Sequence, residues 1–211
     1  TIKGSEIADY TNNFLNGSVD TRTTYLYSDG TLVNQGASAA GLKSDAWMTR
    51  GVTRRGELAA STLKQISYYK NTEKGEELVD YSIEYSSDGT KHKTATYYTY
   101  SVDLLRGVEV FKNIVATGTI AVELALAEPA KIAADQKSYT AYVGTIKGSE
   151  IADYTNNFLN GSVDTRTTYL YSDGTLVNQG ASTANLKSDA WMTRGVTRRG
   201  ELAASTLKQI S

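Results

Sequence analysis

Alternation of β-branched or aromatic residues with polar residues predicts β-strands in several parts of the chain. The clearest run, Ser18 to Tyr27, follows an Asn16-Gly17 pair. Successive side chains of a strand point to opposite faces. One face is therefore predicted to carry Thr21, Thr23, Tyr25 and Tyr27, and the other Arg22, Thr24 and Leu26. Asn-Gly predicts a type I′ turn because both of its central residues adopt positive φ. Ser5 to Leu15 is then the first strand of this hairpin, with a short helical turn at its start as the alternative.

The same signals predict a β-meander further along the chain. Turn residues at Asp29-Gly30 precede a short predicted strand, and a second turn at Ser87-Asp88-Gly89 lies between two longer ones. The predicted strands are Thr31 to Asn34, Asp80 to Ser86, Thr90 to Tyr100, one or two within Val108 to Leu126, and Lys137 to Val143.

A few segments favour short helices. Ser44 can cap a helix through Asp45 to Met48 that ends at Gly51, with Trp47 packing this connection onto the sheet. Ala127 to Asp135 has Pro129 in the first turn of a predicted helix. Glu57 to Tyr69 suits a helix by its apolar spacing, but its place in the repeat described below favours a strand.

The chain is organised around an internal repeat. Thr1 to Ser67 returns as Thr145 to Ser211, and the two copies differ only where Ala39 becomes Thr183 and Gly41 becomes Asn185. A shorter motif, Lys-Gly-x-Glu followed by two apolar residues and Asp-Tyr, occurs three times, at Lys3 to Tyr10, Lys74 to Tyr81 and Lys147 to Tyr154.

These repeats predict a domain organisation. Residues 1–144 form one full repeat of two diverged half-units, about 3–73 and 74–146, and residues 145–211 begin the next repeat. Self-similarity at a fixed period is typical of stacked repeats, in which each unit covers its neighbour. The predicted fold is therefore mainly β, a solenoid- or fibre-like array of hairpins with a few short helices.

Composition narrows the function classes. With 22 basic and 23 acidic residues the net charge is −1, which argues against a nucleic-acid partner or a polybasic membrane patch. The most apolar run, Ile120 to Ala127, contains Glu123 and is too short to span a membrane. The absence of cysteine excludes disulfides and thiolate metal sites. The 15 tyrosines, against three phenylalanines and two tryptophans, suit strand surfaces that are half buried and half wet.

Candidate chemistry is sparse. His92 is the only histidine, and it is interpreted as an exposed strand residue. Glu76 and Glu77 would face opposite ways on a strand, so a shared acid–base role for them, or for Glu6, is not favoured. Turn formation explains Asp29-Gly30 and Asp88-Gly89, which lack the spaced acidic ligands of a calcium loop. We therefore predict no catalytic residue, no cofactor site and no metal ligand.

Two surface features leave alternatives open. Arg50, Arg54 and Arg55 can bind phosphate or an acidic glycan, or pair with Glu57 and nearby carboxylates. Asn16-Gly17-Ser18 and Asn160-Gly161-Ser162 match the glycosylation acceptor pattern, although the turn alone explains these residues.

The Tyr-x-Tyr-Ser-Asp-Gly-Thr text from Tyr25 to Thr31, with its relative at Tyr85 to Thr90, resembles the tyrosine–aspartate (YD, or Rhs) repeats. That resemblance implies hairpins that spiral into long surface or toxin-encasing structures. Tyr25 to Gly36 also resembles one choline- or glucan-binding repeat. The broader likeness is to long bacterial surface proteins of Tyr/Thr-rich tandem β repeats.

These features together predict a non-enzymatic segment of an extracellular or cell-surface fibre, stalk or adhesin. Its predicted partners are neighbouring repeats of the same chain or copies of itself in end-to-end contact, and glycans as a further option. It is predicted neither to bind nucleic acid nor to span a membrane. The alternative is a cell-wall or glycan-binding repeat module.

Overall fold

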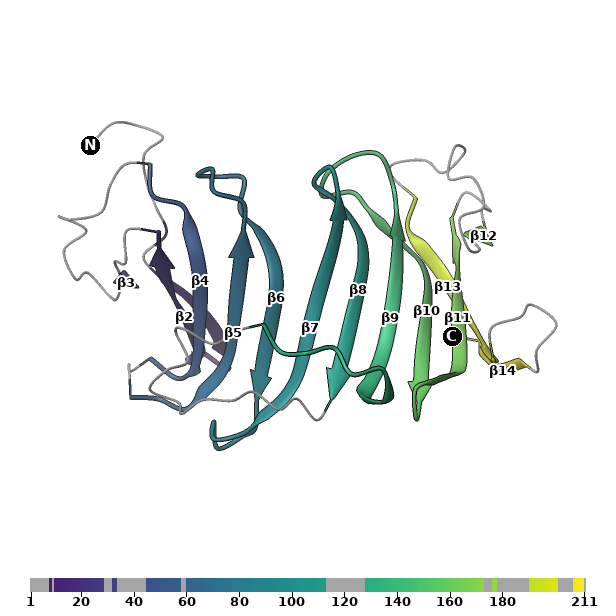
Figure 1. Cartoon of the computed structure of the whole chain (residues 1–211), viewed down its shortest axis with the longest axis horizontal. Helices are drawn as coiled ribbons and strands as arrows, with labels where there is room; N and C mark the ends of the chain where they lie inside the picture. The colour runs from purple at the N-terminus through teal and green to yellow at the C-terminus, as the bar shows by residue number, and fades with distance from the viewer. Residues whose placement is uncertain are drawn as a thin grey trace. The chain divides into compact units, whose positions relative to one another are not determined.

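The computed structural model describes residues 8, 10–28, 32–33, 45–57, 60–112, 128–172, 176–177, 190–200 and 207–210. The chain divides into two compact units, residues 1–95 with 113–129 and residues 96–112 with 130–211. The described residues are mainly β, and their strands pair antiparallel, beside one isolated parallel bridge between Thr21 and Gly56. The predicted antiparallel meander is therefore confirmed (Figure 1).

The first unit follows the pairing order β1-β2-β4-β5-β6, and the start of β7 pairs with β6. A short strand, β3, pairs with β2 beside this path. The elements are β1 (Tyr10–Leu15), β2 (Ser18–Tyr27), β3 (Leu32–Val33), β4 (Met48–Arg55), β5 (Leu63–Lys70), β6 (Leu78–Tyr85) and β7 (His92–Ser101).

The second unit contains the rest of β7 and continues in the order β8-β9-β10-β11-β13-β14, with β12 pairing β11 beside the path. A short 3-10 turn, η3 (Ala133–Asp135), precedes β9. The strands are β8 (Leu104–Lys112), β9 (Gln136–Val143), β10 (Ile151–Leu159), β11 (Ser162–Tyr171), β12 (Leu176–Val177), β13 (Met192–Arg199) and β14 (Leu207–Ile210).

The predicted helices are wrong within the described residues. Ala46 and Trp47 belong to no helix, and Met48 already begins β4, because strand pairing to β2 uses the backbone groups that a helix would need. The predicted helix at 127–135 is reduced to the three residues of η3. The ambiguous segment at 57–69 is the strand β5, as the repeat favoured.

Other predictions fall partly outside the described residues. β8 accounts for the first part of the Val108–Leu126 prediction, and residues 113–126 lie outside the described ranges. Ser44 and the Asp29-Gly30 turn also lie outside them. The Asn16-Gly17 turn is confirmed, with φ of 50° and 80°, as is its second copy at Asn160-Gly161, with φ of 52° and 79°.

The two near-identical segments pair in the same register. Tyr10 lies opposite Thr24 and Tyr154 opposite Thr168, and both hairpins have a bulge at the Asn-Phe step. β2 with β4 and β11 with β13 share the same bulge near their ends, as do β4 with β5 and β13 with β14. The prediction that the copies fold alike is confirmed for the described strands. The division into repeats and half-units remains a prediction, because the compact units follow other boundaries.

The two faces of the first unit differ in chemistry. Val52, Ile66 and Ile83 lie opposite one another across β4, β5 and β6 and are buried. Next to them the rings of Tyr68 and Tyr81 stack at 4.4 Å. The alternate positions of the same strands carry hydroxyl and amide groups, so the apolar side chains form one face of the sheet.

The second unit buries more polar groups. Asn156 and Arg166 are buried, and the Arg166 Nε donates to Asn156 Oδ1 at 2.7 Å. The Arg166 guanidinium lies 4.4 Å from the ring centre of Tyr154, which in turn meets Tyr139 edge-on. Tyrosine thus supplies much of the core surface, and its polar end explains why it outnumbers phenylalanine.

We predict that replacing Gly17 with Val destabilises the protein by about 1 kcal/mol or more, because a β-branched residue resists positive φ. Gly161→Val should cost more. An added Cβ meets nothing within 4 Å at Gly17, whereas at Gly161 it would lie 3.4 Å from Ala134 Cα. Denaturant unfolding of the two single variants measures the difference. Equal losses would contradict the packing argument, and no loss would contradict the turn.

The turn between β7 and β8 uses unfavourable residues. Val102 and Asp103 have φ of 49° and 63°, and Val102 is 92% exposed. Because few packing contacts hold Val102, Val102→Asn should raise the free energy of unfolding by about 1 kcal/mol. The matched control is Asn16→Val, which places valine in the equivalent turn position and should lower it by a similar amount. An unchanged or lower free energy of unfolding for Val102→Asn would contradict the argument that valine strains this turn.

Candidate functional site

His92 begins β7 and is half-buried, which corrects the expectation of an exposed residue. Its ring centre lies 4.9 Å from that of Tyr85 in a tilted arrangement. Burial lowers the pKa of His92, because the charged form loses hydration. The unfolded chain therefore binds this proton at a higher pH than the folded protein does, and protonation of His92 as the pH falls weakens the fold. This is an effect on stability and gives the imidazole no catalytic role.

Glu77 holds two backbone segments together, and this arrangement is called the glutamate clamp below. Its Oε2 accepts a hydrogen bond from the Gly75 N–H at 2.8 Å, and its Oε1 accepts one from the Met48 N–H at 3.0 Å. One carboxylate thereby closes the turn before β6 and holds the first residue of β4. Glu76 is exposed, and Glu6 lies outside the described residues.

Glu150 repeats this clamp in the second unit. Its Oε2 accepts from the Gly148 N–H at 2.8 Å, and its Oε1 accepts from the Leu105 N–H at 3.1 Å. Gly75 and Gly148 have φ of 87° and 81°, so both turns need glycine. Sequence reasoning found the repeated Lys-Gly-x-Glu text at positions 74 and 147 but missed what its glutamate does.

The environment of Glu150 favours its charged form. Partial burial raises the pKa of this carboxyl, but the backbone N–H bonds and the nearby Arg106 outweigh it, so the pKa lies below its usual range. The carboxylate of Asp88 is held in a similar way by the Ser86 hydroxyl and the Thr90 N–H, which lower its pKa to about 2. Asp88 is therefore a turn-forming residue, as predicted from the sequence.

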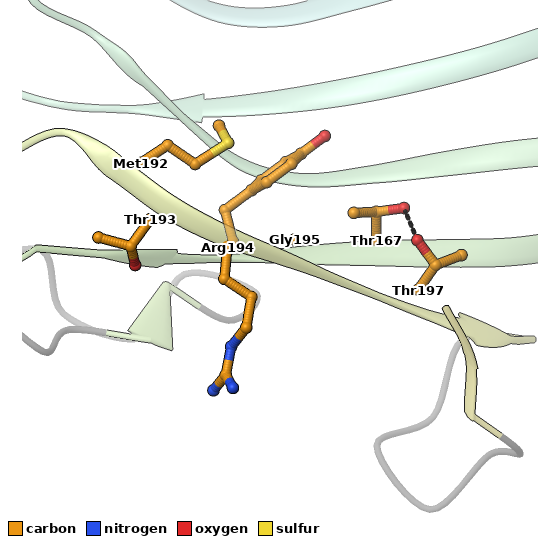
Figure 2. Close-up of a pocket in the computed structure, with 7 residues that line it drawn as sticks. Thr167, Met192, Thr193, Arg194, Gly195 and Thr197 are labelled. Atoms are coloured by element: carbon orange, nitrogen blue, oxygen red, sulfur yellow. Dashed lines mark hydrogen bonds between the residues drawn. The ribbon is translucent and has the colours of Figure 1, made fainter. Parts of the chain in front are cut away.

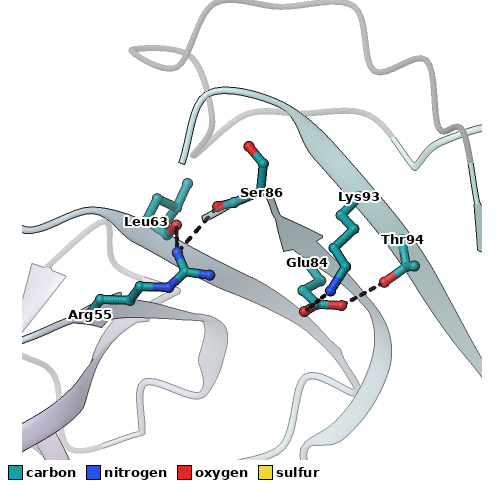
Figure 3. Close-up of polar contacts among 6 residues, drawn as sticks. All are labelled: Arg55, Leu63, Glu84, Ser86, Lys93 and Thr94. Carbon is teal, nitrogen blue, oxygen red and sulfur yellow. Dashed lines mark hydrogen bonds and ion pairs between the residues drawn. The ribbon is translucent and has the colours of Figure 1, made fainter. Parts of the chain in front are cut away.

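The arginine cluster supports strand ends. Arg55 donates to the carbonyl oxygens of Leu63 at 2.8 Å and Ser86 at 3.3 Å (Figure 3). Arg54 donates to the Ser61 carbonyl at 3.0 Å. The predicted partner Glu57 instead lies 3.7 Å from Arg22.

The remaining arginine of the cluster packs on an aromatic ring. The Arg50 guanidinium lies 5.7 Å from the ring centre of Tyr68. Hydrogen bonds to carbonyl groups and contact with a ring both engage a guanidinium within the fold. These contacts give the cluster a structural role and weaken the interpretation of an anion site.

A shallow depression of about 450 Å³ lies on β11 and β13. Its seven lining residues include no carboxylate and no histidine, and they are Thr167, Tyr169, Met192, Thr193, Arg194, Gly195 and Thr197. Figure 2 shows Arg194 pointing away from Met192. The Thr167 and Thr197 hydroxyls bond each other at 2.7 Å, and the Tyr169 hydroxyl bonds Thr155 at 2.8 Å. The lining therefore offers no group placed for acid–base chemistry.

The first copy shows what fits this depression. Gly51 is the counterpart of Gly195, and a Cβ built on Gly51 would lie 3.6 Å from the Tyr69 hydroxyl and 3.6 Å from the Tyr25 ring. Tyr69 of β5 thus approaches the place that is open above Gly195. The depression at Gly195 in the second copy therefore corresponds to the place that Tyr69 approaches at Gly51 in the first copy.

Other candidates remain on the surface. Trp47 is half-buried, consistent with its predicted anchoring role, whereas its counterpart Trp191 is 69% exposed. Asn16 and Asn160 are exposed at hairpin tips, and their glycosylation stays a prediction. Within the described ranges, no group of three His, Cys, Asp or Glu residues is placed to hold a metal ion. No helix in the part that the structure describes has the length and apolar character needed to cross a membrane.

No protein-family model matches this chain, and no curated protein matches it either. The resemblance to tyrosine–aspartate repeats therefore stays a prediction.

We predict that Glu150→Gln destabilises the protein by about 1 kcal/mol, because an amide leaves one N–H facing another donor. Because its pKa is lowered in the folded protein, the stability that Glu150 contributes depends on pH. The contribution of Glu150 is full above its unfolded pKa and is lost as pH falls through the lower folded value.

Denaturant unfolding of the wild type and this variant between pH 7 and pH 3 tests the clamp. The difference between the two proteins should shrink as pH falls. Glu128→Gln is the matched control, because Glu128 is exposed. A constant difference across the range would contradict a role for the charged carboxylate.

Proposed function

We propose that this chain is a non-catalytic structural segment of an extracellular or cell-surface fibre, stalk or adhesin built from tandem β repeats. Neighbouring repeats of the same chain are its principal partners. The observation that carries the proposal is that near-identical sequence 144 residues apart pairs in the same register, bulges included. When each repeat pairs its strands in the same way, further repeats can follow in the chain and pack against the preceding one with the same contacts.

The glutamate clamp supports this proposal because it occurs twice, once just before β6 and once just before β10. Glu77 precedes β6 and binds the first residue of β4, and Glu150 precedes β10 and binds the second residue of β8. β5 and β6 share a register shift beside Asp80, and β9 and β10 share one beside Asp153. The segments around β6 and β10 thus share both the glutamate clamp and the register shift beside an aspartate, as expected for related half-units.

The chemistry of the described residues also suits a structural role. The arginines Arg54 and Arg55 bind backbone carbonyls, and Glu77 and Glu150 bind backbone N–H groups. Charged groups that could act on a ligand are used to hold turns and strand ends. The extracellular location follows from the proposed role.

A cell-wall or glycan-binding module is the rival function. The open depression above Gly195, with Tyr169 in its lining, favours it because sugars stack on aromatic rings. Against it, the place above Gly51 in the first copy is approached by Tyr69. A glycan array with the wild type and Tyr169→Ala separates the two functions. Binding that depends on Tyr169 would support the rival.

The proposal predicts that recombinant chains of two, three and four 144-residue repeats form particles whose length rises in proportion to repeat number. One repeat contributes the eight strands β1, β2, β4, β5, β6, β7, β8 and β9 to the pairing path. At about 4.8 Å per strand, each repeat would add about 40 Å if the path continues. Electron microscopy measures the length. Compact particles whose longest dimension does not grow with repeat number would contradict the proposal.

A further inference from the structure

The strands β1 and β14 each pair with only one other described strand. β1 pairs with β2, and β14 pairs with β13, at the two ends of the pairing order. A strand edge with unpaired N–H and C=O groups can accept another strand. The internal repeat is informative here, because each of these strands has a copy elsewhere in the chain that is paired on both sides.

The β14 edge has its paired copy in β5. Ile66 in β5 is 0% exposed, whereas Ile210, its counterpart in β14, is 54% exposed. Both face the same valine position on the preceding strand, Val52 or Val196. The difference is that β5 also pairs with β6, where Ile83 lies opposite Ile66. The exposed side chain of Ile210 thus leaves room for a further strand beside β14.

The β1 edge has its paired copy in β10. Tyr10 in β1 is 43% exposed, whereas its counterpart Tyr154 is half-buried next to Tyr139 of β9. Asn156 in β10 is 6% exposed, and Asn12 is more accessible. Each of these asparagines accepts a hydrogen bond from an arginine Nε at 2.7 Å. A partner strand can therefore cover Asn12 without leaving its Oδ1 unpaired.

The two edges are related in sequence to two strands that pair with each other, β5 and β6. The residues Leu78 to Tyr81 at the start of β6 are similar to the residues that precede β1 and begin β10. β14 is the counterpart of β5, and β1 is the counterpart of β6. Seating β1 on β14 in the β5–β6 register would place Asn12 opposite Ile210 and Asn13 opposite Gln209.

We propose that the β14 edge of one copy of this chain pairs antiparallel with the β1 edge of a second copy. This interface rests on the proposed structural function and names the contact that would extend it between molecules. Because the two surfaces differ, the contact is heterologous, and a pair of chains still has one β1 edge and one β14 edge that can bind further copies. Association should therefore continue beyond a dimer.

Single lysines at the edges test this interface, since charged residues on edge strands oppose pairing. Ile210→Lys alters the β14 edge. Thr11→Lys alters the β1 edge, where the counterpart Thr155 bonds Thr140 of β9 at 2.9 Å. Val102→Lys is the matched control, because it adds the same charge at an exposed turn away from both edges.

Sedimentation velocity over a range of concentrations should show wild-type chains growing beyond dimers. Each edge variant should raise the concentration of half-association by about tenfold or more, equivalent to about 1.4 kcal/mol. The Val102→Lys control should associate as the wild type does. Circular dichroism and melting temperature establish that each variant is folded.

Mixing the two edge variants gives the decisive measurement. Ile210→Lys keeps an intact β1 edge and Thr11→Lys an intact β14 edge, so an equimolar mixture should form one-to-one dimers and nothing larger. Wild-type assembly that stops at a dimer, or a folded edge variant that associates as the wild type does, would overturn the proposal. A wild-type monomer at all concentrations would overturn it as well. If repeat chains still lengthened with repeat number in that case, the proposed structural function would stand without this interface.

Discussion

The backbone hydrogen bonding of strand edges is the constraint on which this protein depends. A single antiparallel layer satisfies its N–H and C=O groups only if each strand has a neighbour on both sides. Short turns supply that neighbour from the next stretch of chain, as between β1 and β2 or between β7 and β8. Pairing by nearest neighbours makes the fold local and repeatable, and among the described strands β1 and β14 each have a strand neighbour on one side only.

The side chains of this sheet form a buried apolar face and a polar face. In the first unit the row Val52, Ile66 and Ile83 is buried on one face, while Thr23 and Thr53 bond each other at 2.7 Å on the other. Tyrosine serves both needs. Tyr27 and Tyr171 are buried, yet each hydroxyl donates to a backbone carbonyl at 2.8 Å. Burial and the neighbouring Tyr169 and Asp153 raise the pKa of Tyr171 to about 12, so this donor keeps its proton at physiological pH.

Charged residues complete the backbone where strands begin and end. Glu77 and Glu150 accept hydrogen bonds from backbone N–H groups of Met48 and Leu105, and Arg55 donates to the carbonyls of Leu63 in β5 and of Ser86 just after β6. Such bonds to ionised groups are stronger than neutral ones. In the described residues these charged side chains therefore stabilise turns and strand ends.

The sequence by itself determined the local features: the Asn16-Gly17 turn, the strand Ser18–Tyr27 and the equal registers of its two copies. Turn conformation and side-chain alternation depend on neighbouring residues, and these can be read directly. Tertiary pairing decided the rest. It placed Met48 in a strand where a helix was predicted, directed Arg54 and Arg55 to carbonyl groups, and made Glu77 a clamp. Ile66 and Ile210 show the reason most clearly, because the same residue in the same sequence is buried in one copy and exposed in the other. What decides between them is whether another strand lies alongside, which no local pattern records.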